Sequence, residues 1–118
     1  MTKEERIERA RQLHQQGCNC CQSVVLAWSD RLPIDSQHAS DVAAPFGRGL
    51  AGTREVCGCV SGMAMVCGLT GHTADVRTLI EKFREENGDI VCGRLLKSGK
   101  KPCREMVADA AGLLAEIE

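Results

Sequence analysis

Apolar residues recur at helical spacing along most of the chain, and no segment alternates apolar with polar residues as a half-buried strand would. A capping-box sequence at residues 2–5 predicts the start of a first helix, for which Gly17 is a suitable end. Asn19 predicts the start of a second helix that Pro33 ends, and a short third helix is expected over residues 36–44. The first part of the chain therefore predicts two or three helices.

An uncharged segment, residues 56–69, dominates the second half of the chain, and its apolar residues occupy every side of a helix. A helix without a polar face is buried all round, so this segment is expected to be the central helix. Thr73 is expected to cap the next helix, which ends at Gly88, and Asp89 to cap a short helical turn. Pro102 suits the first position of the last helix.

Three glycines within residues 46–52 predict a loop in the middle of the chain. Gly58 and Gly62 are expected to let neighbouring backbones approach the central helix closely. The fold class predicted is a compact all-α single domain, residues 1–118, of five or six helices around a central apolar helix.

Composition excludes several classes of partner. The net charge is -1 and the chain has one Trp, two Phe and no Tyr, so neither a basic patch nor a stacking platform for nucleic acid is expected. The apolar part of residues 56–69 is too short to span a bilayer. The first 16 residues lack the apolar run of a secretory signal, so a cytoplasmic protein is expected, in which structural disulfides are rare.

Cysteine is the unusual residue, with eight in 118 positions. Four of them fall in or near the first turn of a predicted helix: Cys20, Cys57, Cys92 and Cys103. A helix N-terminus carries partial positive charge and stabilises a thiolate. We therefore predict that the four thiols share one anionic site, as metal ligands, cluster ligands or a dithiol pair. The alternative is that they are inert, because buried cysteine packs as a small hydrophobe.

Several blocks of the sequence resemble one known pattern. They are Gly17-Cys18-Asn19-Cys20-Cys21-Gln22-Ser23-Val24, the glycine loop at 46–52, Cys57-Gly58-Cys59-Val60-Ser61-Gly62, Cys92 with Leu95-Leu96, and Cys103 with Val107. In these blocks the chain resembles the small family of proteins described as redox-active and named for its C_GCAxxG_C_C cysteine pattern. The resemblance covers most of the chain and implies redox or metal chemistry, with no established substrate.

The cysteines that match the family pattern are the four at predicted helix starts: Cys20, Cys57, Cys92 and Cys103. The sequence departs from the pattern at Cys21 and Cys59, where the family usually has Ala, and Cys18 and Cys67 are additional. These departures leave open whether the site is a plain four-thiol site or an enlarged one. We expect Cys67 to be an inert core residue, and Cys21 or Cys59 could act as a resolving cysteine.

The leading hypothesis is a cytoplasmic redox-active protein in which the four matched cysteines form one metal site. An iron–sulfur cluster is preferred over zinc, because the resemblance points to redox work and zinc performs none. A second hypothesis is a metal-free thiol–disulfide protein, with Cys20 and Cys57 as the redox-active thiols and a Cys20–Cys57 disulfide as one pairing. A third is a non-catalytic helical module with structural zinc. Whether the chain is an enzyme stays open, and an electron-transfer or thiol partner is expected.

The histidines and two arginines are weaker candidates for site residues than the cysteines. His14 falls on the apolar face of the first helix, where it is either a buried structural residue or a neighbour of the cysteines. His38 and His72 stand among polar residues and are expected at the surface. Arg48 and Arg54 flank the glycine loop, either solvated or holding an anionic ligand or a cluster's charge.

Overall fold

Capping residues set where several of the helices begin. In the computed structural model, which describes residues 1–117, Thr2 forms the predicted capping box with Glu5 at the start of α1. Asn19 forms a second capping box, with Gln22, at the start of α2, and the Asp35 side chain caps α3 by accepting from the His38 N–H. The three starts agree with the sequence expectations. The elements are α1 (Lys3–Gln15), α2 (Cys20–Leu26), η1 (Ser29–Arg31), α3 (Ser36–Ala43), η2 (Ala44–Phe46), α4 (Gly47–Leu50), α5 (Gly58–Leu69), η3 (Thr73–Asp75), α6 (Val76–Asn87), α7 (Cys92–Ser98) and α8 (Cys103–Glu116).

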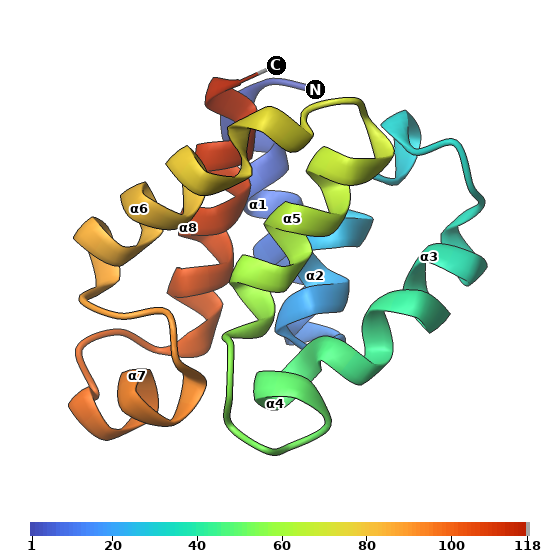
Figure 1. The fold of residues 1–118 in the computed structure, drawn as a ribbon. Helices are drawn as coiled ribbons and strands as arrows, with labels where there is room; N and C mark the ends of the chain where they lie inside the picture. The colour runs from blue at the N-terminus through green and yellow to red at the C-terminus, as the bar shows by residue number, and fades with distance from the viewer. Residues whose placement is uncertain (118) are drawn as a thin grey trace.

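The all-α prediction is confirmed over residues 1–117, in which one isolated β-bridge joins Val56 to Val91 and no strand forms (Figure 1). The helix count differs from the five or six expected. Seven regular helices form in this range, because the short segments α3 and α7 are both complete helices. The element α4 is a kinked turn rather than a further helix, since Arg48 and Gly49 have left-handed backbone angles.

Glycines allow α5 to pack closely on α2. A methyl group added at Gly62 would lie 2.9 Å from the Val24 Cβ, and one at Gly58 would lie 3.0 Å from the Cys21 backbone nitrogen. The expectation of close backbone approach at these glycines is therefore confirmed. In Figure 1, α5 crosses in front of α2, and α5 also contacts α6 and α8.

The expected burial of residues 56–69 on every side is wrong for one edge of the helix. Ser61 and Met65 are partly exposed and Gly68 is exposed, one helical turn after another on the same side. The helix also begins at Gly58 rather than at residue 56, because Val56 is held in the bridge to Val91.

Three other boundaries differ from expectation. Thr73 begins the 3-10 turn η3, and α6 starts after Asp75 without a side-chain cap. Pro102 is the residue before α8 rather than its first position. The second helix ends at Leu26, well before Pro33, because the next carbonyl, that of Ala27, accepts a hydrogen bond from a buried arginine.

That arginine, Arg6, is the main polar group of the core, with none of its surface exposed. Its guanidinium donates to the Ala27 carbonyl at 2.7 Å and to both carboxylate oxygens of Asp30. It also stacks 4.7 Å from the centre of the Trp28 ring. Arg6 therefore ties α1 to the end of α2 and to η1.

The length and hydrophobicity of the helices determine whether any of them could span a membrane. Among residues 1–117, none of the helices combines the length and the apolar character needed to cross a membrane.

Candidate functional site

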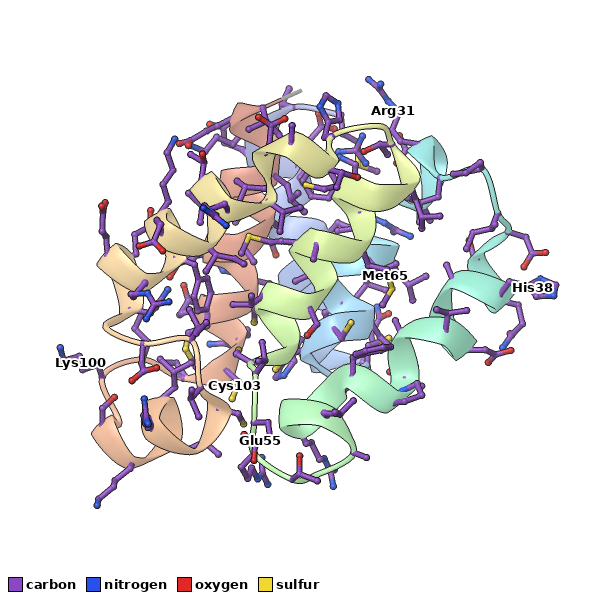
Figure 2. All side chains as sticks on the ribbon, viewed as in Figure 1. Arg31, His38, Glu55, Met65, Lys100 and Cys103 are labelled. Atoms are coloured by element: carbon purple, nitrogen blue, oxygen red, sulfur yellow. The ribbon has the colours of Figure 1, made fainter. Side chains whose placement is uncertain are left out.

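A cavity of about 300 Å³ opens at the end of the molecule where α2, α5, α7 and α8 begin. Five cysteines contribute to its wall: Cys18, Cys20, Cys57, Cys92 and Cys103. This end is at the bottom of Figure 2, where the labelled Cys103 lies beside the start of α8 and Glu55 lies in the segment before α5. The four cysteines singled out in the sequence thus line one cavity.

Each of those four cysteines stands at the start of a helix, as predicted. Cys20, Cys92 and Cys103 are the first residues of α2, α7 and α8, and Cys57 is the N-cap of α5. Four segments far apart in the sequence therefore deliver one thiol each to the same cavity.

The start of α7 differs from a free helix N-terminus because its first N–H groups are already bonded. Cys92 N–H donates to the Glu55 carbonyl at 2.7 Å, and Gly93 N–H donates to the Arg54 carbonyl at 3.0 Å. Positive charge reaches the Cys92 sulfur from a side chain instead, since the Arg54 Nη1 lies 3.7 Å from Cys92 Sγ. A guanidinium donor, rather than free backbone N–H groups, therefore contacts the Cys92 sulfur.

Contacts between the thiols lower the pKa of two cysteines at the site and raise the pKa of two others. Hydrogen bonds from the Cys103 and Cys59 thiols, together with the nearby His14, hold the pKa of Cys20 well below its usual range. A hydrogen bond from the Cys59 thiol also lowers the pKa of Cys57. The same contacts, together with burial, raise the pKa of Cys103 and Cys59. Cys20 and Cys57 are therefore the cysteines that favour the thiolate form, and Cys103 and Cys59 are those that favour the thiol.

Cys59 is a site residue that the sequence did not single out for this role. It is fully buried behind the cavity wall and hydrogen-bonds to the sulfurs of both Cys20 and Cys57. The signal available was its position two residues after Cys57, which places both on the first turn of α5.

The remaining cysteines lie in different surroundings. Cys18 and Cys21 have Cys-x-x-Cys spacing, but Cys18 is half-buried in the cavity wall whereas Cys21 packs in the core, where burial raises its pKa to about 12. Cys67 is fully buried outside the cavity wall, and burial raises its pKa to about 11. Its inertness stays a prediction that this placement favours.

The histidines separate as site and surface residues. His14 lines the cavity, and its Nε2 lies 4.0 Å from Cys20 Sγ. His38 is mostly exposed and pairs with Asp35, and the half-buried His72 pairs with Asp75. His14 is therefore the histidine that can act on the cysteine site.

Among residues 1–117, the cavity thiols do not form a ready-made site for a single metal ion. Residues 1–117 contain no group of three or more His, Cys, Asp or Glu side chains arranged to hold one metal ion, and all eight cysteines, which lie in this range, are free thiols. A tetrahedral zinc site needs its ligands at about 2.0–2.3 Å from one centre. A cluster distributes its cysteine ligands over several irons, so it accepts sulfurs that are further apart.

A strained loop, residues 48–54, positions one wall of the cavity. Gly49 in this loop has a left-handed backbone (φ +67°), and an added methyl would lie 2.5 Å from the Arg54 Cα and 2.7 Å from the Cys92 Cβ. Gly52 has the same backbone hand (φ +82°) but open space around it.

Gly49→Ala is therefore expected to lower the free energy of unfolding by about 2–5 kcal/mol. The alanine adds backbone strain, and its methyl group clashes with the Arg54 backbone and the Cys92 Cβ. Gly52→Ala, the matched control, should lose only about 1–2 kcal/mol, because it has the strain without the clash. Urea unfolding of both variants measures the difference. An equal loss of unfolding free energy in the two variants would show that Gly49 does not lie in close contact with Arg54 and Cys92.

Comparison with known proteins gives one match. The family model described as "Putative redox-active protein (C_GCAxxG_C_C)" matches residues 18–117, a range that contains all eight cysteines. No curated protein and no solved structure matches the chain.

Proposed function

The chain belongs to the C_GCAxxG_C_C family, described as redox-active, and from this premise we propose that its cysteine-lined cavity binds an iron–sulfur cluster for electron transfer. The observation that carries the proposal is the meeting of Cys20, Cys57, Cys92 and Cys103 in one cavity. A thiol–disulfide site needs only two cysteines, whereas here four separate helix starts each supply one cysteine to the cavity. Four cysteine thiolates are the usual ligand set of such clusters.

The charges around the cavity support an anionic group. Arg48, Arg54 and His14 contribute to its wall, and no Asp or Glu does among the described residues. A cluster with four thiolate ligands carries net negative charge, which nearby guanidinium groups compensate. When bound, the cluster would supply one-electron transfer, and the redox potential would depend on the hydrogen bonds to its sulfurs and on its exposure.

Apolar side chains limit the access of water to the site. Leu95, Leu96 and Met106 complete the cavity wall, and Leu95 and Met106 are buried. The cysteines of the wall are themselves buried or half-buried. Their burial protects them from uncontrolled oxidation, and eight free thiols suit a reducing compartment such as the cytoplasm, which we propose as the location.

Metal analysis of the anaerobically purified full-length chain tests this function. The expected result is a coloured protein with iron and acid-labile sulfide, and with little zinc. A colourless protein that binds zinc in a one-to-one ratio would replace electron transfer by structural metal binding. A colourless protein without metal, after reconstitution with iron and sulfide has also failed, would overturn the metal proposal.

A second function, thiol–disulfide exchange, is favoured by one specific contact. The neighbouring Cys103 thiol lowers the pKa of Cys20, and its own pKa is raised, so a cysteine that favours the thiolate lies close to one that favours the thiol. In this alternative Cys20 is the nucleophile, and Cys103, the first cause of its lowered pKa, is preferred as partner to the Cys57 suggested from the sequence. Oxidation would then join the two sulfurs, with two electrons passing to the disulfide of a partner protein and its two sulfurs leaving as thiols.

The lowered pKa of Cys20 predicts a distinctive pH dependence in metal-free, reduced protein. Lowering the pKa keeps the thiolate populated as pH falls below the ordinary thiol range, so Cys20 should still alkylate at about pH 6. Cys103 lines the same cavity but has a raised pKa, so its labelling should begin only at alkaline pH. Mass-spectrometric alkylation across a pH series measures both residues. Parallel pH profiles for the two would show that the thiolate is not localised on Cys20.

A further inference from the structure

Two arginines stand at the cavity without carboxylate partners. Among residues 1–117, no Asp or Glu side chain lies within ion-pair distance of Arg48 or Arg54, and both arginines are exposed while contributing to the cavity wall. Arg54 Nη1 instead lies 3.7 Å from the sulfur of a cavity cysteine, Cys92. Positive charge at the cavity is therefore not neutralised by neighbouring acids.

The backbone holds both arginines in an unfavourable conformation. Arg48 and Arg54 have φ of 55° and 62°, in the left-handed region that favours glycine. The cost is of order 1–3 kcal/mol for each such residue, and strain of this kind gathers at ligand sites. Glycine would relieve it at either position, yet the chain has arginine at both.

Hydrogen bonds fix this strained segment onto α7. Arg54 N–H donates to the Arg48 carbonyl at 3.3 Å, and Glu55 N–H donates to the Gly49 carbonyl at 2.8 Å. The Arg54 and Glu55 carbonyls in turn accept from the first two N–H groups of α7. The arginines are therefore carried on a segment that is anchored beside Cys92, which favours preorganised binding.

We propose that Arg48 and Arg54 form a receptor for a small organic anion, of the carboxylate class, at the mouth of the cavity beside Cys92. The ligand would pair its carboxylate with the two guanidinium groups and so reach the sulfur of Cys92. This inference rests on the proposed function only in placing the redox chemistry at this cavity. It names the charge class of the molecule that reaches Cys92 when no cluster occupies the cavity.

Paired alkylating reagents test the receptor on metal-free, reduced protein. Iodoacetate carries the carboxylate and iodoacetamide is its neutral counterpart, so the ratio of their rates at Cys92 reports anion attraction. Any change in the thiolate population of Cys92 affects both reagents and cancels in the ratio. The wild-type ratio is expected to fall by about three- to tenfold in Arg54→Gly, and to fall at high salt.

Three further variants complete the test. Arg48→Gly should also lower the ratio, whereas Arg54→Lys should largely keep it, because the charge stays. Arg94→Gln removes an equal charge from the exposed surface of α7 and should leave the ratio unchanged. Because glycine relieves the left-handed strain, the Tm of Arg54→Gly should not fall, which separates loss of the receptor from loss of the fold.

The result that would overturn the receptor is an iodoacetate-to-iodoacetamide ratio that is the same in wild type, Arg54→Gly and Arg94→Gln. Equal losses in Arg94→Gln and Arg54→Gly would also overturn it, since net charge alone would then explain the preference. Iron content of wild-type protein is measured separately. A protein that binds iron but shows no change in the ratio keeps the proposed function and loses the receptor.

Discussion

Serine in place of any one of four cysteines, Cys20, Cys57, Cys92 or Cys103, is expected to lower the iron content of anaerobically purified protein at least about tenfold. Outer-shell partners of metal ligands already change affinity by about 10–100-fold, and direct ligands should change it by no less. All four thiols line the same cavity, so the four variants should behave alike. Iron and sulfide analysis of each purified variant measures the loss.

Two cysteine variants serve as controls for that experiment. Cys67→Ala alters a buried cysteine outside the cavity wall and should keep the iron. Cys59→Ala removes the hydrogen bonds to the Cys20 and Cys57 sulfurs but no proposed ligand, so it should keep the iron and change the redox potential. Loss of iron from a folded Cys67→Ala protein, or full iron in Cys92→Ser, would contradict the four-ligand assignment.

The largest effect on stability is expected from Arg6→Ala, which should lower the free energy of unfolding by about 3–5 kcal/mol, because it empties the volume of a large, fully buried side chain. The substitution removes the hydrogen bonds to the Ala27 carbonyl and to Asp30, and it leaves a void against the Trp28 ring. Urea unfolding measures the change. Arg77→Ala, an exposed arginine on α6, is the control and should change stability by less than about 0.5 kcal/mol.

The Arg6–Asp30 pair also predicts the direction of a pH effect. The guanidinium lowers the pKa of Asp30, so its contribution to stability is present above the ordinary carboxyl pKa and is lost as pH falls through the lowered one. Wild-type protein should therefore lose this contribution in acid, below about pH 4. Arg6→Ala should lack that part of the pH dependence. A wild-type and a variant profile of the same shape would show that the pair adds no pH-dependent stability.

Local signals predicted much of this fold. Thr2 and Asn19 cap helices as predicted, by short-range hydrogen bonds that depend on residues only three positions away. The placement of the four matched cysteines at helix starts followed from the same local rules. Short-range physics is sufficient for these features, because neither the cap nor the first turn needs a distant partner.

Features that depend on distant contacts were not predictable in the same way. Arg6 lies on the buried face of α1, and its burial is compensated by the Ala27 carbonyl, Asp30 and the Trp28 ring, all far along the chain. The hydrogen bonds of Cys59 to two cavity sulfurs likewise require α2 and α5 to be packed together. The helical period of α1 predicted polar residues on its outer face, and a charged residue inside the core breaks that pattern.

The middle loop shows a third kind of difference. Its glycines predicted a loop at residues 46–52, and in the structure the left-handed residues include Arg48, Leu50, Ala51 and Arg54 as well as glycines. Propensity alone places glycine at such positions. The hydrogen bonds between this segment and α7 supply the compensation, and they form only in the folded chain.

X-ray absorption at the iron edge of the anaerobically purified, full-length protein tests the central claim most directly. The account predicts a first shell of sulfur around iron, with iron–iron scattering beyond it, and loss of this signal in Cys20→Ser and Cys92→Ser. A zinc edge with four sulfur neighbours and no iron would contradict electron transfer. Reconstituted protein with neither metal, together with a disulfide between Cys20 and Cys103 after oxidation, would contradict the cluster and leave thiol–disulfide exchange as the function of the cavity.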